Sequence, residues 1–253
     1  MRRTEEILVR VALTVLVVGA LIFALSRADY DYDFGAIWGY RTLFLKGLGM
    51  TVLATLVAYL IGLVGGVVVA LARMSRKLPI RHLGDLYVET IRGTPFLVQL
   101  SIAYFGIAPL LRIDNKFGVG VLALGMFAAA YIGEIFRAGV ESVERGQFEA
   151  GRSLGLTRTQ TLRHIVFPQA FKRMIPPLTG EMIALTKESS LLFVIGIVEL
   201  MAVARQAGFD SYNTFEAYVV GACLYLTITV PLSLLARRLE RRLGVAHHLG
   251  AHL

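Results

Sequence analysis

Apolar residues in this chain gather in long runs that are separated by short polar stretches. A helix needs roughly 20 apolar residues to cross about 30 Å of hydrocarbon, and it satisfies its own backbone hydrogen bonds. The pattern therefore predicts an all-α membrane protein with about six transmembrane helices. These helices are expected at residues 7–25, 47–71, 94–111, 119–138, within 171–200, and at 215–236.

The fifth of these segments is interrupted by prolines and charges. Pro176 and Pro177 occur inside it, and Lys187 and Glu188 follow. Proline removes a helical hydrogen bond, and a charge inside a membrane is unfavourable. We therefore expect a broken helix, followed by a re-entrant or interfacial piece around residues 193–204.

The amino-terminal part, residues 1–43, combines the first span with a polar stretch. Its basic start and apolar run would also suit a cleaved signal, but no convincing small-residue cleavage site precedes residues 27–33. We interpret the run as a retained span. The polar stretch mixes Asp29, Asp31 and Asp33 with aromatic residues, so we expect it at the outer membrane interface.

Small residues recur at four-residue steps within two of the predicted spans. Gly62 and Gly66 lie in the second span, and Gly125, Ala129 and Gly133 lie in the fourth. Residues at this spacing share one helix face, and small side chains let two helix backbones approach closely. We expect these faces to be helix contacts, the alternative being that the spacing arose by chance.

The composition agrees with lipid as the main solvent. Of 253 residues, 56% are hydrophobic and 17% are charged, and the mean hydropathy is +0.64. This is more apolar surface than one water-soluble core needs. The formal net charge of +8 does not indicate nucleic acid, because the basic residues cluster between apolar segments without aromatic interleaving. A single cysteine, Cys223, excludes a disulfide within the chain.

Basic residues fall mainly on one side of the membrane when the predicted spans alternate. Because loops rich in Lys and Arg stay in the cytoplasm, both termini are predicted to be cytoplasmic, together with residues 141–168 and the basic tail 237–253. This side holds Arg2, Arg3, the group from Arg73 to Arg81, seven residues from Arg137 to Arg173, Arg237, Arg238, Arg241 and Arg242. The other side keeps Arg27, Arg41, Lys46, Arg112, Lys116 and Arg205.

The cytoplasmic segment 141–168 has the signals of two short helices. The sequence from Glu141 is typical of a helix of about three to four turns, ending where Gly155 adopts a left-handed conformation. Thr157 suits the N-cap of a second helix, with Gln160 at capping-box spacing. Pro168 marks where that helix must end or restart.

This predicted hairpin has an apolar side and a charged rim. The rim consists of Arg152, Arg158 and Arg163. A hairpin with an apolar side and a charged rim suits docking into a groove of another protein. The alternative is a basic loop whose apolar residues pack back on the bundle or lie on the membrane surface. The apolar residues are Phe148, Leu154, Leu156, Leu162, Ile165 and Phe167.

The hairpin sequence resembles the EAA loop of ABC importer permeases. Its one departure is Gly151, where the family usually has a second alanine. Glycine keeps the close approach there but weakens the helix by up to about 1 kcal/mol. The residues that match the loop, and that the resemblance makes the ATPase-coupling contact, are Glu149, Ala150, Gly151, Gly155, Ile165 and Pro168.

The resemblance extends over roughly residues 47–235 and is strongest to permeases of polar amino acid importers. It implies a type I importer-like core of five helices in residues 44–236, with the coupling loop at 141–168 and an extra amino-terminal span. The matching runs are GLGMTVLATLVAYLIGL from Gly47, YVETIRGTPFLVQL from Tyr87, AYIGEIFRAGVESVERGQFEAGRSLGL from Ala130, FPQAFKRMIPPL from Phe167 and TKESSLLFVIGIVEL from Thr186.

The resemblance implies a subunit that moves polar amino acids across a bacterial inner membrane. It implies ATP-binding-cassette ATPase subunits, a second permease subunit that is identical or homologous, and an extracytoplasmic amino-acid-binding protein. No GxxxxGK[ST] phosphate loop occurs in this chain, so we expect ATP and Mg²⁺ on the ATPase partner. The chain itself is predicted to be no enzyme and to bind no cofactor or metal.

Ionisable residues within the predicted spans are candidates for the substrate path, because a charge inside a membrane is energetically unfavourable and often marks a functional site. Lys187, Glu188, Ser189 and Ser190 stand at the expected break of the fifth span, where free backbone groups and hydroxyls suit an amino acid's carboxylate and ammonium. The alternative is that Lys187 and Glu188 reach the outer interface and are solvated. Glu181 is also intramembrane.

Three further polar residues are interpreted less directly. Thr94 and Gln99 flank the break at Pro95 and are expected to line the path, although Gln99 equally suits an interhelical hydrogen bond. Glu134 lies three residues before Arg137, so we expect an ion pair within the helix rather than ligand binding.

An ion-coupled secondary transporter of small polar solutes is the alternative function. It would use the intramembrane carboxylates for coupling, and its fold predicts an internal repeat. The two halves of the chain show no convincing similarity, and such a transporter has no need of a cytoplasmic hairpin.

Overall fold

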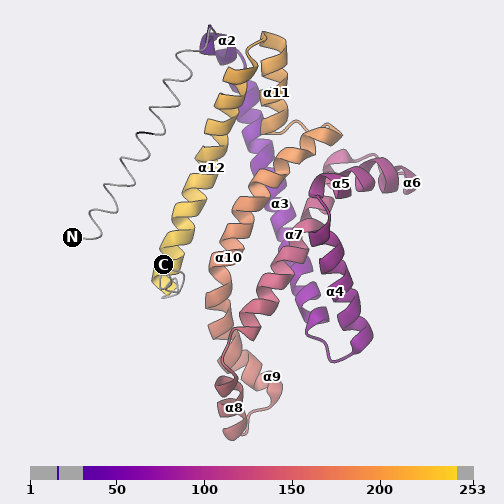
Figure 1. Ribbon diagram of the computed structural model, residues 1–253, viewed down its shortest axis with the longest axis vertical. Coiled ribbons are helices and arrows are strands. Elements are labelled where there is room, and N and C mark those ends of the chain that lie inside the picture. The colour runs from indigo at the N-terminus through magenta and orange to yellow at the C-terminus, as the bar shows by residue number, and fades with distance from the viewer. Residues whose placement is uncertain (1–15, 17–30, 244–253) are drawn as a thin grey trace, which may run out of the picture.

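The computed structural model describes Leu16 and residues 31–243, and the described part contains helices and no strand (Figure 1). The predicted first span lies outside the described residues, apart from Leu16. In chain order the helices are α2 (Phe34–Trp38), α3 (Arg41–Arg73), α4 (Leu78–Gly93), α5 (Phe96–Ser101), the π-helix η1 (Ile102–Ile107), α6 (Ala108–Leu110), α7 (Lys116–Glu141), α8 (Arg145–Ser153), α9 (Arg158–Thr161), the π-helix η2 (Leu162–Val166), α10 (Phe167–Glu188), the 3₁₀-helix η3 (Ser189–Ile195), α11 (Leu200–Ser211) and α12 (Thr214–Leu243).

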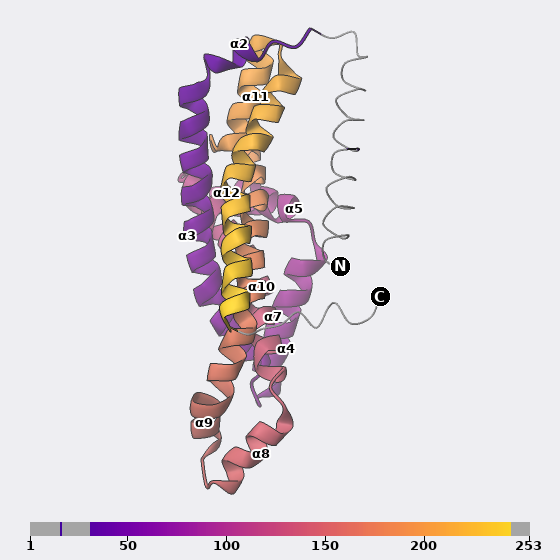
Figure 2. The same ribbon diagram turned by 90° about the vertical axis from the view of Figure 1, so that its left-hand side faces the viewer.

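Three helices are each long and apolar enough to cross a membrane, namely α3, α7 and α12. They confirm the second, fourth and sixth predicted spans. The third and fifth predicted spans correspond to two bent pairs of helices, so the described residues hold up to five crossings if each pair is one span. Figure 2 shows α8 and α9 at one end of the elongated molecule, and α2 and α11 at the other.

The third predicted span is the second arm of a bent pair. The sequence predicted only residues 94–111, but the structure adds α4 before them and turns by 105° between the two arms. Proline disfavours helical backbone in the residue before it, and Thr94 before Pro95 is accordingly extended, with φ −125° and ψ 145°. The break is therefore confirmed, whereas α4 was missed because its sequence is polar.

The fifth predicted span breaks later than expected. The prolines Pro176 and Pro177 lie inside the continuous helix α10, so the expectation that they interrupt it is wrong. Each proline removes one donor while keeping a helical φ, and membrane helices tolerate this when neighbours compensate. The chain instead changes to η3 after Glu188, turns at Gly196 with φ +76°, and enters α11 at 54° to the preceding helix. This agrees with the re-entrant or interfacial piece expected around residues 193–204.

The packing of α3 against α7 confirms the predicted small-residue faces. A Cβ atom on Gly62 would lie 2.7 Å from Cβ of Ala128, and one on Gly66 would lie 2.6 Å from Cγ2 of Ile132. From the other side, a Cβ on Gly125 would meet Cγ2 of Ile61 at 2.6 Å. The two helix backbones can approach this closely only because these positions lack side chains.

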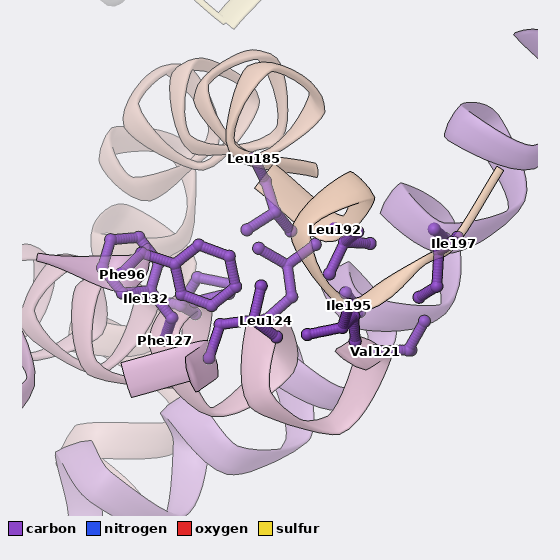
Figure 3. Close-up of a cluster of buried hydrophobic side chains, with 13 residues drawn as sticks. Phe96, Val121, Leu124, Phe127, Ile132, Leu185, Leu192, Ile195 and Ile197 are labelled. Atoms are coloured by element: carbon purple, nitrogen blue, oxygen red, sulfur yellow. The ribbon is translucent and has the colours of Figure 1, made fainter. Parts of the chain in front are cut away.

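One apolar core joins the two bent pairs to the α3–α7 contact (Figure 3). The core cluster includes Phe96 and Leu100 from α5, Leu124 from α7, and Leu192 and Ile195 from η3. Its aromatic rings are in mutual contact, with the centroids of Phe96 and Phe127 5.1 Å apart. The helix ends that flank both breaks are thereby held around the same core.

Candidate functional site

The hairpin projects from one end of the molecule as α8 and α9, beyond the ends of the other helices (Figures 1 and 2). Its first helix is shorter than predicted. Helix α7 ends at Glu141, and α8 starts only at Arg145, after an extended Glu144 with ψ 138°. At this interruption the side chain of Val143 is buried in a small core together with Val166 and Met174.

The turn between α8 and α9 is fixed by two capping motifs. Gly155 has φ +73°, and the N–H groups of Gly155 and Leu156 donate to the carbonyls of Arg152 (2.9 Å) and Gly151 (3.0 Å). This is a Schellman motif, which satisfies the last carbonyls of α8. Thr157 and Gln160 form a complete capping box at the start of α9. Both predicted caps are confirmed.

The apolar residues of the hairpin divide between two surroundings. Phe148 and Leu162 pack against the small core around Val143, as the alternative interpretation expected. Leu154 and Phe167 are 75% and 56% exposed. The hairpin is therefore attached to the bundle by part of its apolar surface and leaves the rest uncovered.

The residues that match the EAA loop are mostly accessible. Glu149, Ala150, Gly155 and Pro168 are exposed, Ile165 is half-buried, and Gly151 is buried. Pro168 marks a restart and not an end, as one of the two predicted outcomes, because it lies in the first turn of α10. The chain passes from α9 through the π-helix η2 into α10, so helical structure is continuous across Pro168.

Two polar contacts fix the base of the hairpin to α10. The guanidinium of Arg173 donates to the carbonyl oxygen of Ser142, and its Nη1 lies 3.3 Å from the Ser142 hydroxyl oxygen. The amide nitrogen of Gln169 donates to Oε1 of Gln147 at 3.2 Å. These contacts connect the end of α7 and the start of the hairpin to α10.

At the first helix break, the two candidate residues bind each other. Nε2 of Gln99 donates to Oγ1 of Thr94 at 2.9 Å, and also to the carbonyls of Thr94 (3.0 Å) and Ile91 (2.7 Å). The Thr94 hydroxyl donates to the Thr90 carbonyl at 2.9 Å. Gln99 thus makes the hydrogen bonds between helices that the alternative interpretation foresaw, and these bonds hold α4 and α5 at their angle.

At the second break, the four candidate residues differ in accessibility. Lys187 is exposed, whereas Glu188 and Ser190 are half-buried. Ser189 is fully buried, and its hydroxyl donates to the Thr186 carbonyl at 2.8 Å. Helix α5 contacts η3, so the structure brings the two breaks together around the core shown in Figure 3.

Sequence reasoning missed Arg92, at the end of α4. Its guanidinium lies 5.2 Å from the ring centroid of Tyr131, a cation–π geometry. The signal that would have found Arg92 was its position directly before Gly93, where the helix break begins.

The predicted ion pair of Glu134 and Arg137 is present and belongs to a larger cluster. Oε1 of Glu134 accepts from Nη2 of Arg137, and its Oε2 accepts from Arg73 of α3. These residues lie at the ends of α3 and α7 that face the hairpin.

Comparison with known families gives a match over most of this architecture. Residues 59–245 match the model of the family described as "Binding-protein-dependent transport system inner membrane component". The chain belongs to this family. It is therefore a transport permease.

Relatives of this permease match more than four fifths of the chain. It is 36% identical over 214 residues to the arginine transport system permease protein ArtQ of Bacillus subtilis, covering 84% of this chain and 98% of that protein. It is 36% identical over 218 residues to the glutamine transport system permease protein GlnP of Escherichia coli, with coverage of 85% and 99%.

Solved structures show the same fold for the permease. A chain from the crystal structure of an amino acid ABC transporter with histidines matches with a TM-score of 0.80 and 39% identity, covering 84% of this chain and all of that one. The MetNI methionine ABC transporter in an inward-facing conformation matches with a TM-score of 0.65 at 20% identity, over 82% of this chain and 97% of that one. The second match supports the type I importer fold alone.

Proposed function

We propose that this permease is the membrane subunit of an ATP-driven importer of polar amino acids, and that its hairpin is the contact with the ATPase partner. The named substrates of its relatives, arginine and glutamine, support the substrate class. The chain has no phosphate-binding loop, so ATP and Mg²⁺ belong to the ATPase.

The observation that carries the coupling role is a rigid, partly uncovered hairpin. Two capping motifs fix its turn, and Leu154, Phe167 and Glu149 are all exposed. An apolar helix face with a charged rim suits a groove on a partner protein. Because Arg173 and Gln169 tie the hairpin base to α10, movement of the ATPase reaches the membrane helices as a rigid-body displacement.

The rest of the assembly follows from this role. A second permease subunit, identical or homologous, completes the translocation path, and an extracytoplasmic binding protein delivers the amino acid. The permease lies in the inner membrane with the hairpin end in the cytoplasm, where most of its basic residues fall. The substrate passes the two helix breaks, where Lys187, Glu188 and Ser190 offer charges and a hydroxyl.

The test is reconstitution of the permease with its ATPase and binding protein in proteoliposomes. Gly155→Asp disrupts the left-handed cap, and Glu149→Lys reverses a charge on the docking face. Both variants should insert normally but lose stimulation of ATPase activity by the loaded binding protein. Glu144→Lys, the same charge change at the base of the hairpin, is the matched control and should keep stimulation.

Unchanged stimulation in both motif variants would count against the coupling role. Uptake that needs an ion gradient and proceeds without the ATPase would instead support an ion-coupled transporter.

A further inference from the structure

Arg73 links three helices at the end of the bundle that faces the hairpin. Its Nε donates to Oδ1 of Asp85 in α4 at 2.8 Å, and its Nη1 donates to Oε2 of Glu134 in α7. The side chain of Arg73 is only 14% exposed. A guanidinium that bridges two carboxylates in a fixed fork keeps both partner helices at a defined angle.

The ion pairs continue from Arg73 to the foot of the hairpin. Arg137 pairs with both Glu134 and Glu141, and Glu141 is the last residue of α7. On the α4 side, Arg81 lies 3.8 Å from Asp85. Three positive and three negative side chains thus alternate in one network, which we call the charge clamp. Its members are Arg73, Arg81, Asp85, Glu134, Arg137 and Glu141.

Helix α4 is attached through polar and backbone contacts in its first half, and further on through the buried Val88 and through Ile91, which packs against the main apolar core. A Cβ on Gly84 would lie 2.8 Å from Cγ of Arg73, so the α4 backbone rests directly on the Arg73 stem. One turn further on, the Tyr87 hydroxyl donates to the Met126 carbonyl of α7 at 2.6 Å. By contrast, the apolar side chains of Leu83 and Leu86 are 67% and 61% exposed and do not hold α4 to this chain.

The charge clamp stands between the two functional regions. At one end, three residues separate Glu141 from the start of α8 in the hairpin. At the other end, Asp85 is on the helix that ends at Gly93, where Thr94 and Gln99 make the break beside the core of Figure 3. Helix α4 therefore connects the clamp to the break.

We propose that the charge clamp makes α3, α4 and α7 move as one body with the hairpin, so that movement of the ATPase reaches the break at Gly93–Pro95. This proposal rests on the proposed function and adds the route of coupling. The clamp residues are positioning residues, since they act by holding α4 and touch no substrate. Single exposed ion pairs contribute little, but a shared, partly buried arginine couples its partners.

The first test measures amino acids transported per ATP hydrolysed by the assembled complex in proteoliposomes. Asp85→Asn and Glu134→Gln each remove one carboxylate from Arg73 without changing side-chain size. Each should keep ATPase activity while transport per ATP falls about fivefold or more, the lower end of typical coupling factors. Glu89→Gln, an exposed position one turn along α4 and outside the clamp, is the control and should not change the ratio.

Two further variants separate a clamp from general destabilisation. The double variant D85N/E134Q should be no worse than the more impaired single variant, because both changes act through Arg73. Arg73→Lys keeps the charge but not the fork, so it should fall between the parent and D85N. Additive losses, or an unaltered ratio in D85N and E134Q, would overturn the proposal.

A spectroscopic distance tests the rigid body directly. The chain has one cysteine, so Leu83→Cys on α4 and Gly146→Cys on α8 can carry spin labels in a Cys223→Ser background. The distance between the labels should be the same in nucleotide-free and ATP-trapped parent complex, and should broaden in E134Q. A change in the parent on ATP trapping would overturn the clamp.

The two proposals fail in different ways. If the parent complex shows no ATP-dependent uptake at all, the proposed function fails. If the parent couples normally but the label distance changes, or if D85N and E134Q couple normally, only the clamp fails.

Discussion

The side chain of Thr161 in α9 fills the space directly over Gly151 in α8. A Cβ on Gly151 would lie 2.5 Å from Cγ2 and 2.7 Å from Oγ1 of Thr161. Thr161 is itself buried, and its hydroxyl donates to the Thr157 carbonyl at 3.0 Å. The glycine that departs from the usual EAA pattern is therefore matched by the threonine ten residues later, and the two helices of the hairpin cross at this point.

We predict that Gly151→Ala loosens the hairpin, although alanine is the usual residue there and favours helix by about 1 kcal/mol. The added methyl group overlaps Thr161 and forces α8 and α9 apart, at about 1–3 kcal/mol for overpacking. Amide hydrogen exchange of residues 145–166 should become faster. Gly146→Ala, on the same helix with no atom within 4 Å of its Cβ, should leave exchange unchanged or slower.

A companion variant checks that the overlap is the cause. G151A/T161A removes the overlapping methyl and hydroxyl, so it should restore much of the protection. Equal exchange in G151A and the parent would show that the crossing adjusts without strain.

A second prediction concerns the contact of α3 with α7. Gly66→Ala places a methyl group 2.6 Å from Cγ2 of Ile132 and 3.0 Å from the Gly133 nitrogen, where a backbone must move. We expect a loss of about 1–3 kcal/mol and a lower Tm of the detergent-solubilised permease. Gly49→Ala in the same helix, at an exposed position with open space, should have no such effect. The same Tm for both variants would argue against close packing at Gly66.

Long apolar runs and local caps were predictable because each depends on residues adjacent in sequence. The spans that became α3, α7 and α12 needed only an apolar run. Gly155 and Thr157 were recognisable because their chemistry matches caps that form within a few residues.

Features that depend on distant partners could not be read from the sequence. Helix α4 looks polar because Asp85 and its neighbours are matched by Arg73 of another helix. Val143, at the interruption before α8, is buried in one cluster with Met174, thirty-one residues away in the chain. The continuity of α10 through Pro176 likewise depends on its neighbours and not on the proline itself.

A third prediction addresses the substrate path at Lys187. Its side chain is exposed at the end of α10 and forms no ion pair within residues 31–243. If it meets the carboxylate of the amino acid, Lys187→Met should weaken uptake and change the preference among acidic, neutral and basic amino acids. Competition of labelled uptake by a panel of amino acids measures this. Lys172→Met, an exposed lysine on the same helix nearer the hairpin, is the control. Identical competition profiles for parent and K187M would remove Lys187 from the path.

The last prediction concerns Glu199, which is fully buried at the start of α11. Its carboxylate accepts from the N–H groups of Met201 and Ala202, both at 2.8 Å, and from the Tyr225 hydroxyl at 2.9 Å. The three donors match an ionised carboxylate, which has acceptors only. Because Glu199 caps α11 and binds α12, it fixes the piece that follows the second helix break.

The relative stabilities of two variants test this interpretation. Glu199→Gln turns one acceptor into an N–H donor that faces another donor, so we expect a loss of about 1–3 kcal/mol. Tyr225→Phe removes one donor and leaves both backbone bonds, so we expect about 0.5–1.5 kcal/mol. Thermal unfolding of the purified permease should therefore rank parent, Y225F and E199Q in decreasing stability. An E199Q variant as stable as the parent would show instead that Glu199 carries a proton and donates one of these bonds, since glutamine reproduces one donor and one acceptor.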